Sequence, residues 1–434
     1  MKVLHVSTAD SSGGAARAAY RLHRALLDIG MDSQMRVLSS GLDDATVKGG
    51  NPRSIARRGL EKLHKRRINR TQRNWYTDNT VPHTFGQIGA GLVKELNNSD
   101  VDILNLHWVT GMLSIPDIGR LQKPIVWTLH DMWAFCGAEH YASDEVQARF
   151  RSGYRVGNRP SGERGPDLNR KTWEAKRRAW AKQTFTLVSP SEWLADCARD
   201  SALLGHCPVE VVPNPLDTEY PWRPVPQPVA RTALGLPSDA KLILMGADGG
   251  VRDPRKGGDL LRAAMTRVME QTAKDDVRLL IFGQSATSAS QDVWPCPVHW
   301  LGPVRDDRAL ALTYSAADIM VVPSRQDNLP NTATEAQACG TPVVAFDIGG
   351  LPDIVEHLTT GWLAKPFDIE DLATGIRWML WGEGRSPSVR VNSRKLAVQR
   401  FAGHNVAERY REIYLQAITR STQLPQHAHI MANT

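Results

Sequence analysis

The feature that most constrains the fold is the alternation of short apolar runs with longer amphipathic stretches along the 434-residue chain. This alternation predicts parallel β-strands joined by helices, because a parallel pair of strands needs a crossover connection. The runs are rich in Val, Ile and Leu, which is typical of strands buried on both faces. The expected strands of the first half are 3–8, 35–39, 103–107, 125–129, 185–189 and 209–212. Those of the second half are 242–246, 278–282, 299–301, 319–322 and 343–346.

A proline-rich stretch, 213–228, separates the two sets of strands. Proline cannot continue a central strand or a helix interior, so we interpret the stretch as a linker; a proline-rich loop inside one domain is the alternative. The predicted fold class is therefore α/β, with two doubly wound, Rossmann-like domains. The expected boundaries are 1–214 and 215–395, followed by a helical segment, 396–420, and a disordered tail, 421–434.

Composition excludes several classes of protein. Apolar residues make up 41% and charged residues 23%, which is ordinary for a globular chain and rules out a fibre or an extended disordered protein. No apolar run reaches the length of a membrane span, and residues 1–8 are interpreted as a first strand and not as a signal peptide. The five cysteines are dispersed, which predicts reduced thiols in the cytoplasm and neither disulfides nor a zinc site.

The net charge of +7 is unevenly distributed. Nine basic residues and a single acid lie between Arg53 and Arg73, and a second basic stretch runs from Arg170 to Lys182. Such stretches attract anionic lipid headgroups, nucleic acid or phosphorylated molecules, although a solvated helix face is the alternative. We expect an anionic membrane surface to contact the first stretch and expect no nucleic acid, because no nucleic-acid-binding motif accompanies the charge.

Polar and glycine residues follow several of the expected strands of the first half. Gly13 and Gly14 come after the first strand and open a helix, where they allow a ligand to approach the backbone; a tight turn is the alternative. His107 and His130 close two further strands, at the edge where open α/β sheets bind ligands. A structural histidine is the alternative for each. Asp131 is adjacent to His130, and we expect it to hold the tautomer of His130 or to tune its pKa.

Two motifs of the second half predict a site for a phosphorylated ligand. Arg252 and Lys256 follow a strand, where cations can neutralise the charge that develops on a departing diphosphate; a charged loop is the alternative. Further on, Asp327 lies in the loop before a helix that is expected to start near Asn331, and Glu335 lies one turn inside that helix. Backbone amides at the start of a helix can donate hydrogen bonds to a phosphate, and a carboxylate can accept hydrogen bonds from the two vicinal hydroxyls of a ribose.

Taken in order, these motifs resemble the retaining glycosyltransferases of family four, which have the GT-B fold. The resemblance is greatest to the branch that builds bacterial exopolysaccharide and similar surface glycans, and it extends over nearly the whole chain. It implies two Rossmann-like domains that face a central cleft, an acceptor domain first and a donor domain second, with a last helix that crosses back to the first domain. The motifs are Gly13-Gly14, Trp127–Asp131, Ser189-Pro190-Ser191, Pro213-Asn214, Arg252 with Lys256, Asp327 to Glu335, and Tyr410 with Tyr414.

The resemblance also implies roles for single residues. Gly13 and Gly14 would form the loop near the diphosphate and the acceptor, and His130 would be the active-site histidine near the donor sugar. Arg252 and Lys256 would bind the donor diphosphate. Arg252 lies four residues before Lys256, where many family members have five, so Lys256 is the better supported of the two.

The acidic motif departs from the family pattern at two positions. Asp327 stands where the family usually has a glutamate that contacts the transferred sugar, and it is one methylene shorter. Pro330 replaces a glycine and has no N–H to donate. The resemblance implies that Glu335 binds the ribose and that the amides of Leu329 and Asn331 face the sugar or the phosphates.

The predicted function is transfer of a hexose from a nucleoside-diphosphate sugar to a glycan or lipid-linked glycan, with retention of configuration, in surface polysaccharide biosynthesis. Neither a metal nor another cofactor is implied. The expected location is the cytoplasm, at the inner face of the membrane. Two alternatives remain: another GT-B enzyme, such as a nucleotide-sugar epimerase or a phosphorylase, and a binding protein that has the fold without the activity.

Overall fold

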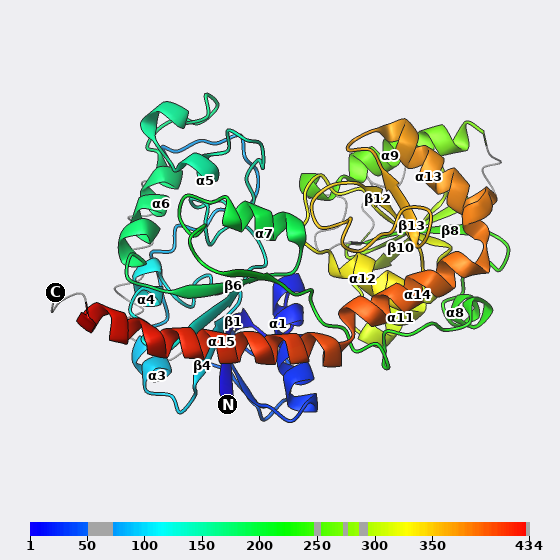
Figure 1. Cartoon of the computed structure of the whole chain (residues 1–434). Helices are drawn as coiled ribbons and strands as arrows, with labels where there is room; N and C mark the ends of the chain where they lie inside the picture. Colours follow the sequence, from blue (N-terminus) through cyan, green and yellow to red (C-terminus); the bar gives the residue numbers. More distant parts are fainter. Residues whose placement is uncertain (51–72, 247–252, 272–276, 286–293, 431–434) are drawn as a thin grey trace. The chain divides into compact units, whose positions relative to one another are not determined.

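The computed structural model describes residues 1–50, 73–246, 253–271, 277–285 and 294–430, the last seven of these as backbone alone. The chain forms two compact units. The first unit combines Met1–Val212 with Ala407–Thr434, and the second unit is Pro213–Val406 (Figure 1). The division lies at the start of the proline-rich stretch. The basic residues from Arg53 to Arg70, like Arg252, lie outside the described residues.

The first unit contains a seven-stranded parallel sheet in the order β3-β2-β1-β4-β5-β6-β7. The strands are β1 (Lys2–Ala9), β2 (Asp32–Ser39), β3 (Val47–Lys48), β4 (Ile103–Leu106), β5 (Ile125–Thr128), β6 (Phe185–Ser189) and β7 (Val209–Val211). The helices are α1 (Gly14–Asp28), α3 (Val93–Asn97), α4 (Ile115–Ile118), α5 (Arg149–Ser152), α6 (Leu168–Ala179), α7 (Glu192–Arg199) and the 3₁₀ helix η1 (Val156–Asn158). Strand β3 was not predicted, because two residues are too few to form an apolar run.

The two faces of this sheet differ in polarity, because successive strand residues point to opposite faces. Leu4, Leu104 and Trp127 belong to the large apolar core that includes residues of α3, α4, α6 and α7. Their neighbours on the other face include Asn105 and Thr128.

A long last helix, α15 (Gly403–Ile430), supplies tyrosines to this polar face. The Tyr414 hydroxyl donates to Asn105 at 2.6 Å, and the Tyr410 hydroxyl lies 3.1 Å from Thr128 Oγ1. The end of the chain is therefore part of the first unit.

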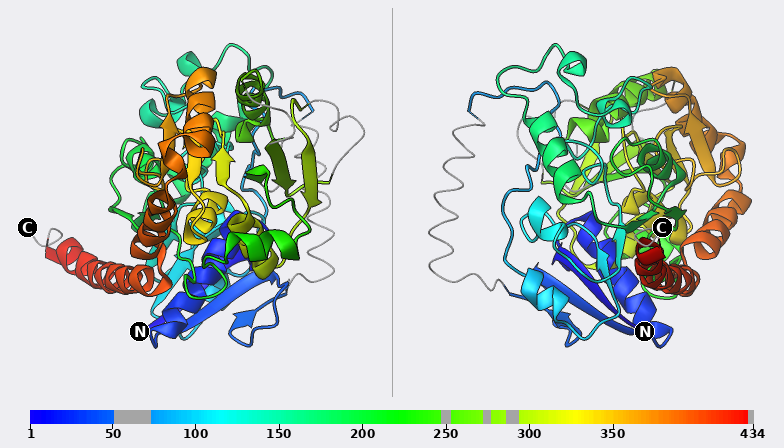
Figure 2. Two further views of the ribbon diagram at one scale, coloured as in Figure 1. Left: turned by 90° about the vertical axis from the view of Figure 1, so that its right-hand side faces the viewer. Right: turned by 60° about the vertical axis from the view of Figure 1, so that its left-hand side comes forward.

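The second unit contains a six-stranded parallel sheet in the order β10-β9-β8-β11-β12-β13. The strands are β8 (Lys241–Gly246), β9 (Val277–Phe282), β10 (Val298–Gly302), β11 (Ile319–Val322), β12 (Val343–Phe346) and β13 (Gly361–Ala364). The helices are α8 (Gln227–Ala233), α9 (Gly258–Met269), α11 (Asp307–Ala316), α12 (Asn331–Ala338), α13 (Ile369–Trp381) and α14 (Pro387–Phe401), with 3₁₀ helices η3 (Pro254–Lys256) and η5 (Glu383–Arg385). Helices cover both faces of the sheet (Figure 2).

Alternation along the strands of the second unit divides its core in two. Leu242 and Leu244 pack in a cluster with residues of α8, α11, α12 and α14. Ile243 and Met245 pack in a second cluster with residues of α9 and α13. Both faces are apolar, as the Val-, Ile- and Leu-rich runs predict. The predicted α/β class with two Rossmann-like sheets is thus confirmed.

The expected helical segment 396–420 is wrong in detail, because two helices meet within it. Helix α14 ends at Phe401 and α15 begins at Gly403, and the ψ angle of 130° at Ala402 interrupts the helical path. The cause is a strand-like pairing: Leu216 N–H donates to the Phe401 carbonyl at 2.7 Å, and Gly403 N–H donates to the Leu216 carbonyl at 3.0 Å.

The expected disorder from residue 421 is also wrong, because α15 continues to Ile430. Extending an existing helix costs far less than starting one, so residues 421–430 add turns to a helix that is already formed. Residues 431–434 lie outside the described part of the chain.

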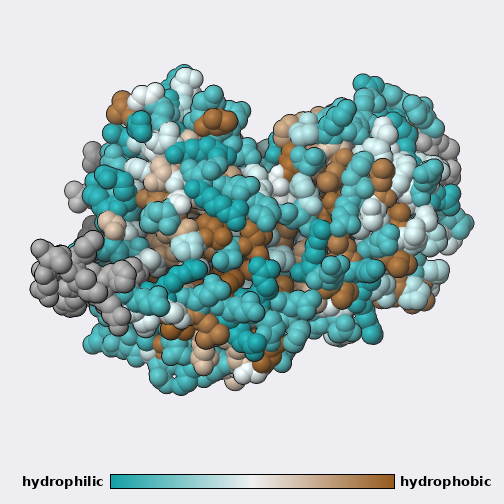
Figure 3. All heavy atoms as spheres, in the orientation of Figure 1, coloured by the Kyte–Doolittle hydropathy of each residue, from teal (hydrophilic) through white to brown (hydrophobic). Residues whose placement is uncertain are grey.

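The face shown in Figure 3 is largely hydrophilic, with small and separate hydrophobic patches. Within the described residues, no helix combines the length and the apolar character that crossing a membrane requires.

Candidate active site

The glycine pair of the first unit forms the turn that starts α1. Gly14 is the first residue of the helix, and Gly13 precedes it with φ at +87°, a value that L-residues rarely adopt. A side chain at residue 13 would therefore strain the turn, although a Cβ atom there would meet no atom within 4 Å. The backbone at this helix start is thus accessible to a ligand.

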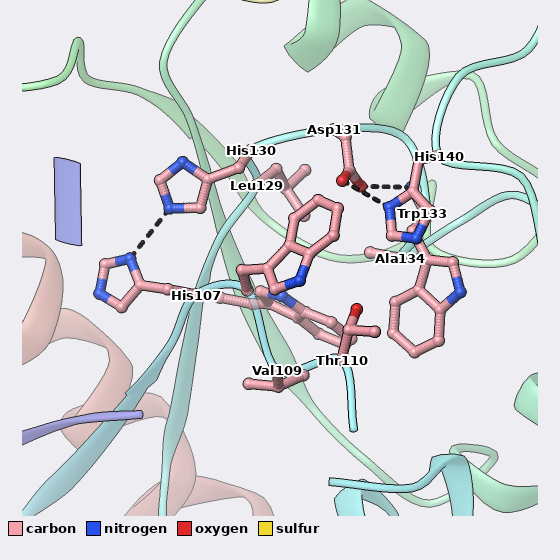
Figure 4. Close-up of a pocket in the computed structure, with 11 residues that line it drawn as sticks. His107, Val109, Thr110, Leu129, His130, Asp131, Trp133, Ala134 and His140 are labelled. Carbon is pink, nitrogen blue, oxygen red and sulfur yellow. Dashed lines mark hydrogen bonds and ion pairs between the residues drawn. The ribbon is translucent and has the colours of Figure 1, made fainter. Parts of the chain in front are cut away.

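His130 follows β5 and belongs to a row of histidines on one face of the sheet. His107 follows β4, and its Nδ1 lies 3.1 Å from His130 Nε2 (Figure 4). On the inner side, His107 Nε2 lies 2.9 Å from Nδ1 of His5, which is on β1. His5 and His107 are buried and His130 is partly buried. Sequence reasoning found His107 and His130 as strand-end residues but missed His5, which lies in the middle of a strand.

Burial keeps these histidines uncharged. Desolvation lowers the pKa of His130 to about 4, and the nearby Asp131 carboxylate offsets this only in part. For His107, desolvation and the neighbouring imidazoles of His5 and His130 depress the pKa well below 6.5. At neutral pH each ring therefore has one N–H donor and one nitrogen acceptor.

Of the two roles predicted for Asp131, the structure supports only the effect on the pKa of His130, because the Asp131 carboxylate makes its hydrogen bonds elsewhere. Its carboxylate accepts from His140 Nδ1 at 2.7 Å and from the Trp133 amide at 2.8 Å. Since adjacent residues at the end of a strand point in different directions, Asp131 faces His140 and His130 faces His107 (Figure 4).

A pocket of the first unit lies beside these residues. His140 lines this pocket, and its ring is stacked on the Trp108 ring with centroids 4.4 Å apart, while the Trp133 ring lies 6.3 Å away. Sequence reasoning missed His140, because it lies in a loop and no strand end marks it. The pocket is lined by His107, Trp108, Val109, Thr110, Trp127, Leu129, His130, Asp131, Trp133, Ala134 and His140.

In the second unit, Lys256 and Asp327 form an ion pair between two loops that are far apart in the sequence. Lys256, at the end of η3, donates to Asp327 at 2.6 Å. Ser324 donates to the same carboxylate at 3.2 Å, and the Arg255 guanidinium lies 3.8 Å from it. Arg255, which was not among the predicted site residues, is therefore a second cation beside the acidic loop, residues 323–330.

The Asp327 carboxylate is buried but ionised. Burial favours the neutral form, yet the charges of Lys256 and Arg255 and the hydrogen bonds from Lys256 and Ser324 outweigh it and hold the pKa below its usual value. The loop is also fixed from the β12 side, because Gly350 N–H donates to the Asp327 carbonyl at 3.1 Å. The glycine pair 349–350 thus serves a close backbone contact within the unit.

The acidic loop leads into α12, which begins at Asn331 as predicted. Leu329 is 5% exposed, and the Asn331 side chain lies 3.5 Å from the amide of Asn214. Glu335 is one turn inside the helix, 3% exposed, and accepts from the Tyr314 hydroxyl at 2.9 Å. Lys256, Asp327 and the start of α12 therefore belong to one site of the second unit.

The predicted site residues are divided between the two units. Gly13, Gly14 and His130 belong to the first unit, whereas Lys256, Asp327, Leu329, Asn331 and Glu335 belong to the second. Arg252 lies outside the described residues. Within the described parts of both units, no group of three or more histidine, cysteine, aspartate or glutamate side chains is arranged to hold a metal ion.

Family models match both halves of the chain. The model described as "Glycosyltransferase Family 4" matches residues 12–220, and the one described as "Glycosyl transferases group 1" matches residues 242–381. The first match lies mostly in the first unit, and the second match contains η3, the acidic loop and α12.

Two curated relatives have the same name, D-inositol 3-phosphate glycosyltransferase. The protein of Thermobispora bispora is 32% identical over 51% of this chain, and the match spans about half of that relative, 54%. The protein of Xylanimonas cellulosilytica is 29% identical over 79% of this chain and 79% of the relative.

Solved structures share the fold over nearly the full chain. HepE of Anabaena, solved with UDP and glucose, matches with a TM-score of 0.64 at 15% identity, over 95% of this chain and 99% of that one. WaaG, described as a glycosyltransferase involved in lipopolysaccharide biosynthesis, matches with a TM-score of 0.59 at 16% identity, over 95% and 99%. Family models match both units, and the solved structures share the architecture of two parallel sheets. The chain therefore belongs to the family 4 glycosyltransferases with the GT-B fold.

Proposed function

We propose that this protein is a retaining glycosyltransferase whose second unit binds a nucleoside-diphosphate sugar. The observation that carries the proposal is the Lys256–Asp327 ion pair at 2.6 Å in front of α12, with buried Glu335 one turn inside that helix. A cation, a helix start and a carboxylate are the groups that a diphosphate followed by a ribose requires. HepE, which shares the fold, was solved with UDP and glucose.

The proposed chemistry depends on the charge that develops when the sugar leaves the diphosphate. Lys256 would stabilise this charge, since an ammonium has three N–H donors and the bond to Asp327 takes one of them. Asp327 would hold Lys256 in place, and its predicted contact with the transferred sugar remains a proposal. Arg252 is proposed as a second diphosphate ligand, and the amides of Leu329 and Asn331 as contacts of the sugar or phosphates.

The other proposed contacts lie in the first unit. Gly13 and Gly14 would let the acceptor and diphosphate approach the start of α1. His130, neutral at pH 7 because burial lowers its pKa to about 4, would contact the donor sugar by a hydrogen bond. No metal is part of the proposal, since Lys256 and Arg252 supply positive charge at the diphosphate.

Two classes of acceptor have support. A phosphorylated cyclitol is supported by the shared name of the curated relatives, D-inositol 3-phosphate glycosyltransferase. A glycan or lipid-linked glycan for surface polysaccharide is the class predicted from sequence, and the likeness to WaaG supports it at the level of fold. Binding of Arg53 to Arg73 to the inner membrane face would fit the second class and remains a prediction.

The first experiment is a thermal-shift screen of the full chain with UDP, GDP, ADP, dTDP and their sugars, with magnesium and with EDTA. We expect one nucleotide to raise the unfolding temperature equally in both buffers, because ligands that bind the folded state stabilise it. Product analysis with inositol phosphate or a lipid-linked glycan then identifies the acceptor. Failure of every nucleotide to bind would contradict the proposal, and an epimer formed without acceptor would point to another GT-B enzyme.

Variants test the site directly. Lys256→Ala should weaken nucleotide-sugar binding roughly 10- to 100-fold, the effect of losing a charge-assisted bond to phosphate, and Glu335→Gln about tenfold. Lys256→Ala also removes an ion-pair partner of buried Asp327 and is therefore expected to destabilise the fold. Binding is measured by calorimetry at low temperature, so that the affinity is that of the folded protein. Arg267→Ala is the matched control, since Arg267 is an exposed cation of α9 in the same unit. Equal affinities for all four proteins would overturn the site.

A further inference from the structure

His5, His107 and His130 form a continuous hydrogen-bonded row through the first unit. The two contacts join His5 Nδ1 to His107 Nε2 at 2.9 Å and His107 Nδ1 to His130 Nε2 at 3.1 Å. Neighbouring rings meet edge to edge, with interplanar angles of 29° and centroids 5.2 Å and 5.4 Å apart. The row crosses three adjacent strands, because β1 pairs with β4 and β4 pairs with β5.

The two hydrogen bonds must run in the same direction. Burial keeps all three imidazoles neutral, so each has one N–H and one lone pair. If His5 donates to His107, then His107 has its proton on Nδ1 and donates to His130. If His130 donates instead, every proton in the row moves to the other nitrogen. The row therefore has two arrangements, and they give His130 opposite tautomers.

The inner end of the row selects one arrangement. Nε2 of His5 is buried and has no hydrogen-bond partner among the described residues. Outside the row, the His23 ring lies 5.8 Å from the His5 ring between centroids, and the two nitrogens of His23 already pair with Ser33 and Thr46 at 2.7 Å. Were His130 the donor, His5 would bury an unpaired N–H, which folded proteins avoid more strictly than an unpaired acceptor. The row is thus stable with the His5 proton on Nδ1.

We propose that His107 is a positioning residue that locks His130 in its Nδ1–H tautomer, with His5 as the buried donor behind it. The second ring nitrogen of His130 lies on the side away from His107 (Figure 4) and presents an N–H to a ligand oxygen. The lock makes His130 a hydrogen-bond donor to a sugar hydroxyl and removes it as a general base. No proton passes along the row, because its inner end is closed. The sugar contact rests on the proposed transferase function, whereas the tautomer does not.

The direct test is a two-bond ¹⁵N–¹H correlation spectrum of the full chain with ¹⁵N-labelled histidine. The signals of His130 are assigned by their loss in His130→Gln. We expect a protonated Nδ1 and an unprotonated Nε2 at pH 7, which is the reverse of the tautomer that histidine prefers in water. A protonated Nε2 in the wild-type protein overturns the proposal and needs no variant to be folded.

Variants separate the lock from ordinary packing. His107→Leu should move the His130 proton to Nε2, because it removes the donor that pairs with that nitrogen. His5→Leu should leave the proton on Nδ1, because Nε2 of His107 then becomes the buried, unpaired inner end of the row and the His107 proton stays on Nδ1 for the same reason. His107→Asn should keep the wild-type tautomer, since the asparagine amide nitrogen replaces Nδ1. His23→Gln is the matched control, because His23 is equally buried but outside the row, and it should leave His130 unchanged. A His130 tautomer that is the same in His107→Leu as in the wild type contradicts the role of His107, and a His130 proton on Nε2 in His5→Leu contradicts the argument from the buried inner end.

An activity measurement connects the lock to the substrate. His107→Leu should lower kcat/KM about tenfold, the effect of one lost neutral hydrogen bond, and His107→Asn should restore it. The nucleoside diphosphate that the screen identifies should bind both variants as it binds wild type, because the proposed nucleotide contacts lie in the second unit. If wild type binds no nucleotide sugar, the transferase proposal fails while the tautomer result still stands. Equal kcat/KM for wild type and His107→Leu would overturn the substrate role of the lock.

Discussion

At the scale of single residues, burial leaves the Asp327 carboxylate charged and the His23 imidazole neutral. Asp327 is 6% exposed and stays charged, because Lys256 and Arg255 lie beside it. His23 is fully buried and neutral, because desolvation lowers its pKa to about 4 and the attraction of Asp44 does not compensate. The difference lies in the partners, since a buried charge is tolerated only when it is paired.

His23 should contribute to acid sensitivity. Between pH 6.5 and about 4 the unfolded chain protonates this histidine and the folded chain does not, so the free energy of unfolding falls as the pH falls. One histidine contributes at most about 1.4 kcal/mol per pH unit. His23→Gln should therefore reduce this slope by about one proton. The measurement is urea unfolding at several pH values, with the first unit followed by amide exchange in β1 and β2. His404→Gln, at an exposed site, is the control, and an unchanged slope in His23→Gln would refute the assignment.

At the scale of elements, the junction of η3 and α9 at Gly257 holds η3, which contains Lys256, against the loop after β11. Gly257 connects the two helices with φ at +67°. A Cβ atom there would lie 1.9 Å from the Pro323 carbonyl oxygen. Next to it, Arg325 N–H donates to the Arg255 carbonyl at 2.7 Å. The position of Lys256 is thus set by backbone contact between two loops.

Gly257→Ala should disturb this junction more than an equivalent change elsewhere. Gly235 has a similar φ of +61°, but a Cβ atom there would meet no atom within 4 Å. Gly235→Ala should therefore cost about 1 kcal/mol of stability for strain alone, whereas Gly257→Ala should cost roughly 3 kcal/mol and weaken nucleotide binding. Chemical denaturation and calorimetry measure the two effects. Equal losses in both variants would show that close packing at Gly257 does not matter.

At the scale of the whole molecule, each unit has its own parallel sheet and its own core. The chain completes the second unit and then returns, since residues 407–434 belong to the first. The residues proposed for the donor site, Lys256, Asp327 and Glu335, lie within one unit, so nucleotide binding can be localised in the intact protein.

Hydrogen exchange of the full chain should locate the nucleotide. We expect UDP, or whichever nucleoside diphosphate the screen identifies, to slow exchange in peptides of η3, the loop before α12 and α12 itself. The physical reason is that bound phosphate and ribose would pair with their amides and side chains and suppress local opening. Peptides of β13 and α14 serve as internal controls in the same unit. Slowed exchange confined to Met1–Val212 would contradict a donor site in the second unit.

Much of the fold was predictable, because it depends on local patterns. Runs such as 125–129 and 319–322 identify buried strands, and their alternation with helices leads to two parallel sheets. Strand β13 was missed, because Gly361 opens it and its four residues form no long apolar run. The break at Ala402 was missed because Leu216, its partner, lies far away in the sequence.

The sequence by itself determined the class of fold, the family and the loops that follow each strand, because periodicity, glycines and motif order are local properties of the chain. Only the tertiary structure decided which side chains meet. Lys256 pairs with Asp327 because β8 and β11 are neighbours in the sheet, and His130 faces His107 and not Asp131 because the strands β4 and β5, which His107 and His130 follow, are also neighbours. Such contacts depend on strand order and register, and no single stretch of sequence contains either.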